Sequence, residues 1–344
     1  MAKYDKFTAL LALLMVIGFL YREFWPRESV FQAVIRQTGK SEQRSVVSTL
    51  DAEKSKEVKA DNSPKTKIVE KVVEKIVEKV IVKNETIRIP PEDLFDEMYD
   101  IITTEQIAAA MFKYALTPTY TCKKEIHMGH DPPADGGWDL CLDVEVTPQN
   151  CIVYSFGISD DWSFDDDAVK YGCDVYSFDP TIGLSDHKRS EHHWFYNMGL
   201  WHENVERHFD NHAPNGSLYK DHWTCRTADY IRKMLNHEDR PIDMLKMDIE
   251  GTEHTVFPQM LESGILNHVK QFAFELHMGV GETKQRRWHL YRALETLMRS
   301  YGFQLWKMHP NEAVDDENFG EVAGMHPCCH DLSWINPKFI KAGQ

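Results

Sequence analysis

The chain has 344 residues, with 54 acidic and 39 basic side chains and a formal net charge of −15. This balance argues against an extensive nucleic-acid surface, because such a surface needs a basic footprint. The length allows one large or two medium domains with a sizeable core. We therefore expect a globular domain that acts on a small-molecule or neutral partner and binds no nucleic acid.

An apolar segment opens the chain. Residues 7–21 carry no charge, and basic side chains stand on both sides of them. This run is shorter than the ~20 apolar residues of a full membrane span. The bulky residues that follow offer no small-residue cleavage site. We therefore predict an uncleaved signal-anchor within residues 1–26, which makes the chain a single-pass membrane protein.

A polar stem is expected over residues 27–90, because it is rich in Ser, Lys, Glu and Gln. Within it, a repeat of period four over residues 67–83 places Val and Ile pairs in a stripe along a helix. We interpret this repeat as a stalk that self-associates as a short coiled coil. The alternative is a solvated linker. A folded domain is predicted over residues 91–344, beginning with a helix from about Pro91 to Tyr114.

Two features favour the lumen of the secretory pathway, in the endoplasmic reticulum or Golgi. Glycosylation sequons begin at Asn84 and Asn215. Seven cysteines permit three disulfides and one leftover thiol in an oxidising compartment, although buried reduced thiols are the alternative. No Cys-x-x-Cys pair is present, which argues against structural zinc. The cysteines are Cys122, Cys141, Cys151, Cys173, Cys225, Cys328 and Cys329.

Apolar runs and helical patterns alternate from Cys151 onward, after a segment at 122–143 that we expect to be an irregular loop. This alternation predicts an α/β fold with a doubly wound, mostly parallel, Rossmann-like sheet. Helices are expected at Thr227–Leu235, Glu253–Leu266 and Arg286–Tyr301. Strands are expected at Ile152–Phe156, Val175–Phe178, Met244–Met247, Phe272–Leu276 and Phe303–Lys307, with Leu332–Asn336 as a further strand.

A doubled Val-Tyr-Ser-Phe phrase marks the first two strands. Its first copy runs into Gly157 and its second into Asp179, a separation close to the ~20 residues that place an acid beside a ribose. The G-x-G-x-x-G turn that cradles a pyrophosphate is absent. The pattern favours a nucleoside cofactor without phosphates, such as S-adenosylmethionine. Two ordinary buried strands without a ligand are the alternative.

Acidic residues follow the third and fourth strands. Asp248 and Glu250 lie on one side after the third strand, and they could accept a proton from a substrate hydroxyl or hold a divalent metal. We assign no metal ligands. Glu253 is either functional or a first-turn acid of the next helix. His277 shares a face with Glu275 in the fourth strand and is a candidate general base.

These segments together resemble the methyltransferase-like proteins related to FkbM-type methyltransferases. The Asp-Ile-Glu-Gly-x-Glu block at 248–253 carries the resemblance, together with the order of the preceding motifs from Gly136-Gly137-Trp138 onward. The resemblance covers about residues 90–340. It implies a class I S-adenosylmethionine-dependent fold with a seven-stranded sheet, and a last strand that runs antiparallel.

The resemblance also implies roles for single residues. Gly157 and Asp179 become cofactor contacts, and Asp248 and Glu250 become acids on the acceptor side. From the residues themselves we also assign Ser159 and Asp248 to the cofactor and take His277 as a catalytic candidate. The implied reaction is O-methylation of an unknown acceptor, which a glycan, lipid, protein or small molecule would satisfy.

Two other functions share this layout of anchor, stem and domain. A lumenal glycosyltransferase would use Asp248-Ile249-Glu250 as an acid-x-acid metal motif. An inactive domain would keep the fold and bind without catalysis.

Overall fold

The computed structural model describes the C-terminal two thirds of the chain, apart from short gaps. The predicted anchor, stem, stalk and both sequons lie outside the described residues. The chain divides into two compact units, Met1–Thr103 and Thr104–Gln344, and the fold below is that of the second. No helix within the described part is long and apolar enough to cross a membrane. The described residues are Tyr99, 102–131, 135–212, 218–279, 281–311 and 315–340.

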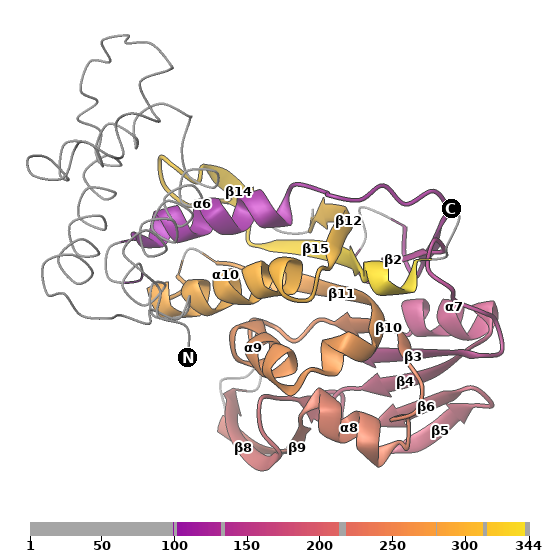
Figure 1. Ribbon diagram of the computed structural model, residues 1–344. Helices are drawn as coiled ribbons and strands as arrows, with labels where there is room; N and C mark the ends of the chain where they lie inside the picture. The colour runs from indigo at the N-terminus through magenta and orange to yellow at the C-terminus, as the bar shows by residue number, and fades with distance from the viewer. Residues whose placement is uncertain are drawn as a thin grey trace, which may run out of the picture. The chain divides into compact units, whose positions relative to one another are not determined.

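An eight-stranded sheet forms the centre of this unit (Figure 1). In spatial order the strands are β12 (Gln304–Pro310), β15 (Cys329–Ile335), β11 (Val269–His277), β10 (Ile242–Met247), β3 (Cys151–Phe156), β4 (Cys173–Phe178), β6 (His193–Tyr196) and β5 (His187–Ser190). The four pairings among β11, β10, β3, β4 and β6 are parallel, whereas β15, β12 and β5 pair antiparallel with their neighbours.

Helices and a hairpin cover the two faces of the sheet. On one face, Val153, Val175 and Met244 pack into a core with the hairpin β1 (Glu125–Met128) and β2 (Trp138–Cys141) and with α7 (Ser163–Tyr171). On the other face, Phe257 of α9 (Glu253–Ser263) contacts Phe272 and Phe274, with ring centroids 5.3 and 5.2 Å apart. Beside α9 lies α10 (Lys284–Arg299), which also contacts α6 (Thr104–Ala115) (Figure 1).

Smaller elements complete the unit. Strand β9 pairs with β7 and β8 in a three-stranded sheet, and β13 pairs with β14. The remaining elements are β7 (Gly199–Leu200), β8 (Val205–His212), β9 (Leu218–Arg226), α8 (Ala228–Met234), β13 (Asp316–Asn318), β14 (Met325–Pro327) and the 3-10 helices η2 (Ile265–His268) and η3 (Pro337–Phe339).

The predicted mixed α/β fold with a mostly parallel sheet is confirmed, and the buried apolar runs are its central strands. The last strand runs antiparallel, as expected, and inserts between β11 and β12. Three expectations were wrong. The segment 122–143 contains the β1–β2 hairpin, the sheet has eight strands rather than seven, and the helix expected to reach Tyr114 is interrupted at residues 102 and 103, after which α6 begins at Thr104.

Three disulfides lie in the described residues, and they match the number that the cysteine count permits. Cys122 is bonded to Cys141, Cys151 to Cys173, and Cys328 to the adjacent Cys329. The second of these bonds joins the starts of β3 and β4, which are paired directly in register. Cys225 is the leftover thiol and is buried.

Candidate active site

Polar residues gather where β3, β4, β10 and β11 end. From β3 the chain passes through α7 to β4 on one side, whereas β10 pairs with β3 on the other side. The strand order therefore changes direction between β3 and β10. In open α/β sheets, ligands bind outside the carboxyl ends of the strands at such a switch point.

Gly157 brings the ends of β3 and β10 into close contact. Its φ is +68°, and a Cβ added there would lie 1.5 Å from the carbonyl oxygen of Asp248. The Gly157 N–H donates to the carbonyl of Phe178 at 2.9 Å, and the Asp248 N–H donates to that of Phe156 at 3.1 Å. Only glycine fits this position, because it tolerates positive φ and has no Cβ.

Asp179 fixes the loop that follows β3. One carboxylate oxygen, Oδ2, accepts from the Ser159 N–H at 2.8 Å. The other, Oδ1, accepts from the N–H and the hydroxyl of Thr181 at 2.7 and 2.6 Å. The residue is 4% exposed. A carboxylate offers about four acceptor positions, so Oδ2 keeps one for a further donor.

Lys246 lies beneath this loop, within the buried strand β10. Its buried ammonium group donates to the carbonyl oxygens of Phe156 and Gly157. It also lies 3.9 Å from Asp248 Oδ2. Lys246 was not among the site residues predicted from the sequence, although a lysine inside the run Asp-Met-Leu-Lys-Met-Asp is unusual for a buried strand. One positive charge therefore contacts the backbone at the end of β3 and lies near Asp248 at the end of β10.

His277 lies among three carboxylates at the end of β11. Its Nδ1 is 3.2 Å from Glu253 Oε1, while its Nε2 is 3.2 Å from Glu275 Oε2 and 3.6 Å from Glu250 Oε2. Burial opposes protonation, but hydrogen bonds to Glu250 and Glu253 outweigh it and raise the pKa of His277 to about 11. In this arrangement both ring nitrogens face carboxylate oxygens.

Two further acids have pKa values raised by the same surroundings. Burial and the nearby charge of Asp248 raise the pKa of Glu275 above its ordinary value. Burial and the charge of Glu275 raise the pKa of Asp331 to about 9. Asp331 is the direct cross-strand partner of Glu275 in the β11–β15 pair. The sequence analysis missed Asp331, because only the register of β15 brings it here.

The predicted site residues fall into two groups that meet at one contact. Asp248, Glu250 and His277 lie together, with ligand atoms within 4.8 Å of one another. Ser159 and Asp179 form the second group. Gly157 packs against the Asp248 carbonyl and connects them. The catalytic and cofactor-binding roles of these residues stay predictions.

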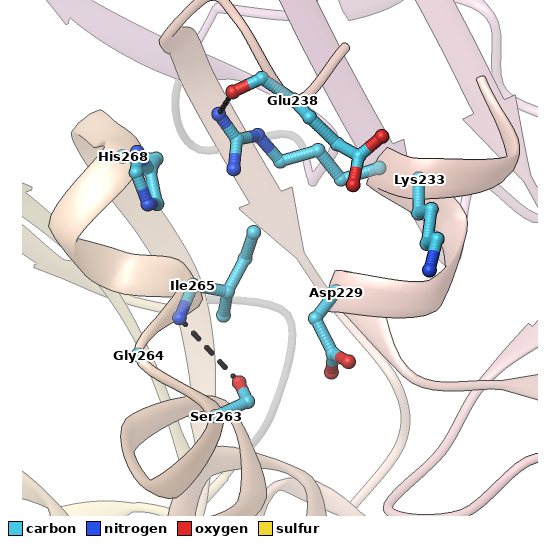
Figure 2. Close-up of a pocket in the computed structure, with 8 residues that line it drawn as sticks. Asp229, Lys233, Glu238, Ser263, Gly264, Ile265 and His268 are labelled. Atoms are coloured by element: carbon cyan, nitrogen blue, oxygen red, sulfur yellow. Dashed lines mark hydrogen bonds between the residues drawn. The ribbon is translucent and has the colours of Figure 1, made fainter. Parts of the chain in front are cut away.

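A cavity of about 240 Å³ lies elsewhere, between α8 and the region where α9 passes into η2 (Figure 2). Asp229 and Lys233 come from one side, and Ile265 and His268 from the other. Helix α8 precedes β10 and η2 precedes β11, so this cavity lies toward the amino ends of these strands. It is therefore separate from the carboxyl-end cluster.

Comparison with known proteins decides the family. The family described as "Methyltransferase domain" matches residues 68–315, more than half of the chain. This chain belongs to the methyltransferase domain family. "Probable methyltransferase-like protein 24" of Homo sapiens is 25% identical over 68% of this chain and 66% of its own length. Its counterpart in Rattus norvegicus is 26% identical over 60% and 58%. The chain thus spans less than two thirds of each relative.

The methyltransferase domain also has a distant likeness among solved structures. The fibrillarin pre-rRNA processing protein of Methanococcus jannaschii is 9% identical, with a TM-score of 0.26 over 64% of this chain and 86% of that chain. The predicted methyltransferase class is confirmed at the level of the family. The finer resemblance to FkbM-type enzymes stays a prediction.

The family implies S-adenosylmethionine as the cofactor, and the switch point fits it in two respects. Asp179 Oδ2 retains an acceptor position for a hydroxyl. Asp248 Oδ1 is buried and has no hydrogen-bond partner among the described residues. Such an orphan acceptor needs an explanation, and a cationic amino group is a suitable donor for it.

Proposed function

We propose that this methyltransferase domain transfers a methyl group from S-adenosylmethionine to a hydroxyl oxygen of an unidentified acceptor. The observation that carries the proposal is Asp248 at the switch point: its carbonyl packs against the Gly157 turn, and its buried Oδ1 has no hydrogen-bond partner in the described part of the chain. Family membership supports the reaction class. The absence of a G-x-G-x-x-G turn after β3 favours a cofactor without a pyrophosphate.

Residues of this chain would act on two sides of the reaction, the cofactor side and the acceptor side. On the cofactor side, Asp179 would accept a ribose hydroxyl while it holds the 157–162 loop through Ser159. Asp248 would accept from the amino group. S-adenosylmethionine, when bound, supplies an electrophilic methyl group on a sulfonium, and the electrons of the broken C–S bond stay on sulfur.

On the acceptor side, the acids around His277 would receive the proton of the acceptor hydroxyl. Proton transfer to a positioned carboxylate of this kind contributes about 10²- to 10⁴-fold to a rate. Alignment of the hydroxyl with the methyl group supplies a further large share, because it converts a bimolecular step into an effectively unimolecular one. Glu250 is the most exposed of these acids, with a side chain 90% exposed, and would meet the acceptor first.

We further propose that the domain works in the lumen of the secretory pathway and is held there by the N-terminal anchor. Three disulfides support an oxidising compartment, since such bonds are rare in the cytosol. The uncharged run at 7–21 supports the anchor. A lumenal methyltransferase requires a carrier that delivers its charged cofactor.

A glycosyltransferase activity is the second candidate. It is favoured by Asp248 and Glu250, which form an acid-x-acid pair beside His277 with ligand atoms within 4.8 Å. This geometry suits a divalent cation that would hold a nucleotide sugar. The third candidate, a binding module without catalysis, predicts a ligand but no product.

Isothermal titration calorimetry on the full chain separates the candidates. We expect one-to-one binding of S-adenosylmethionine with a Kd below ~1 mM, the upper end of ordinary substrate affinities. We expect no heat from a nucleotide sugar with Mn²⁺ beyond that of Mn²⁺ alone. Asp179→Asn should weaken S-adenosylmethionine binding at least tenfold, because it removes the charge that accepts the ribose hydroxyl.

Asp174→Asn is the matched control, because Asp174 stands on β4, the strand that Asp179 follows, and pairs with the exposed His192 at 2.8 Å. It should bind S-adenosylmethionine as the wild type does. Binding of the nucleotide sugar alone would reject methyl transfer in favour of the second candidate. Binding of S-adenosylmethionine without labelled product from any acceptor mixture would favour the third.

A further inference from the structure

Three side chains, which come from one loop and one strand, border a space within the cluster of acids around His277. Asp248 and Glu250 come from the loop after β10, and His277 is the last residue of β11. Their nearest ligand atoms all lie within 4.8 Å of one another. Small rotations of these side chains would bring all three atoms onto one ion, since bonds from metals to oxygen or nitrogen are about 2.0–2.2 Å.

The orientation of the imidazole is fixed from behind. Glu253 is fully buried, and its Oε1 lies 3.2 Å from His277 Nδ1. A proton on Nδ1 therefore donates to Glu253, which leaves Nε2 directed at Glu250 and Glu275. A carboxylate that holds one imidazole nitrogen while the other faces more carboxylates is the arrangement by which proteins orient a histidine toward a metal.

An unpartnered buried oxygen provides an independent observation. Glu253 Oε2 is buried and has no hydrogen-bond partner among the described residues, and the Glu253 side chain is 0% exposed. A buried carboxylate oxygen without a donor is costly unless a cation compensates its charge. The ammonium group of Lys246 lies 3.9 Å from Asp248 Oδ2.

We propose that Asp248, Glu250 and Nε2 of His277 bind one divalent transition-metal cation, with Glu253 as the carboxylate that orients His277. The donor set of two carboxylates and one imidazole suits Mn²⁺ or Zn²⁺ better than Ca²⁺, which takes six to eight oxygen ligands. The exposed side of Glu250 leaves coordination positions open to water or to an acceptor.

The role of this cation in the reaction depends on the proposed methyl transfer. Binding of the cation to the protein does not depend on it. A hydroxyl coordinated to the cation would ionise more readily, because a bound metal lowers the pKa of oxygen ligands. Its proton would pass to Glu275, whose Oε2 lies 3.2 Å from His277 Nε2 and so borders the site. The cation would also favour acceptors with two adjacent oxygens, which can chelate it.

Electron paramagnetic resonance tests the site with Mn²⁺ alone. The full chain, freed of metal with a chelator and dialysed, is titrated with Mn²⁺ while the signal of the free ion is recorded. We expect one Mn²⁺ bound per chain below ~1 mM, and Zn²⁺ should displace it. Glu250→Gln should weaken binding at least tenfold, and its exposed side chain makes the variant safe for folding.

Glu203→Gln is the matched control, because Glu203 is also exposed and lies outside the cluster. It should bind Mn²⁺ like the wild type. Glu253→Gln tests the orienting carboxylate, and we expect a 10- to 100-fold loss of affinity. The proposal is overturned if no Mn²⁺ or Zn²⁺ binds, or if Glu250→Gln binds as the wild type does. Calorimetry with S-adenosylmethionine in chelator separates this failure from failure of the proposed function.

Discussion

Gly157 shows how one residue determines the geometry of the switch point. The sequence pattern predicts that it gives a cofactor room. The structure supplies a second reason, since its missing Cβ allows the Asp248 carbonyl to approach. That contact sets the spacing between the loop held by Asp179 and the acids around His277. A larger residue would separate the two halves of the site.

Replacing this glycine gives a prediction with a close control. Gly157→Ala should lower the free energy of unfolding by roughly 1–3 kcal/mol more than Gly183→Ala, because overpacking adds to the cost of positive φ. The two glycines have φ of +68° and +69°, but a Cβ at Gly183 meets nothing within 4 Å. Urea denaturation measures both. Equal losses would show that the contact with Asp248 imposes no constraint.

At the scale of elements, the Cys151–Cys173 disulfide ties together the two strands that carry the doubled phrase. It closes a loop over α7 and holds the starts of β3 and β4. Their opposite ends carry Gly157 and Asp179. A bond at the amino ends thus limits movement of the strands that end beside Gly157 and Asp179.

Loss of this bond should destabilise the domain. The double variant Cys151→Ser/Cys173→Ser should lose about 3 kcal/mol, because the bond restricts a loop of this size in the unfolded chain. Cys225→Ala removes a buried thiol that forms no disulfide, and it should cost less. Thermal unfolding of both variants, without reductant, makes the comparison. A double variant as stable as Cys225→Ala would contradict the assigned role.

The central strands and the acids at their ends could be read from sequence, whereas the surrounding elements could not. Runs such as Ile152–Phe156 are apolar and bounded by turn residues, so local pattern suffices. Strand β5 is exposed at all four residues and carries no such pattern. Asp331 required the register between β11 and β15, which depends on contacts distant in sequence. The pairing of seven cysteines was open for the same reason.

At the scale of the whole molecule, the sheet has two apolar faces and a polar carboxyl edge. Aromatic and aliphatic side chains fill both faces, and the carboxyl edge collects Lys246, Asp179 and the acids around His277. The cavity between α8 and η2 lies elsewhere. We therefore propose that the cofactor binds at this edge of the sheet, whatever the acceptor proves to be.

Hydrogen exchange with and without saturating S-adenosylmethionine tests this claim most directly, because ligand binding slows exchange where it suppresses local opening. We predict slower exchange in the loops at 157–162, 179–183 and 248–252, and unchanged exchange around Arg232 and His268, which line the cavity between α8 and η2. Protection around Arg232 and His268 instead, or no protection in the three loops, would contradict the account.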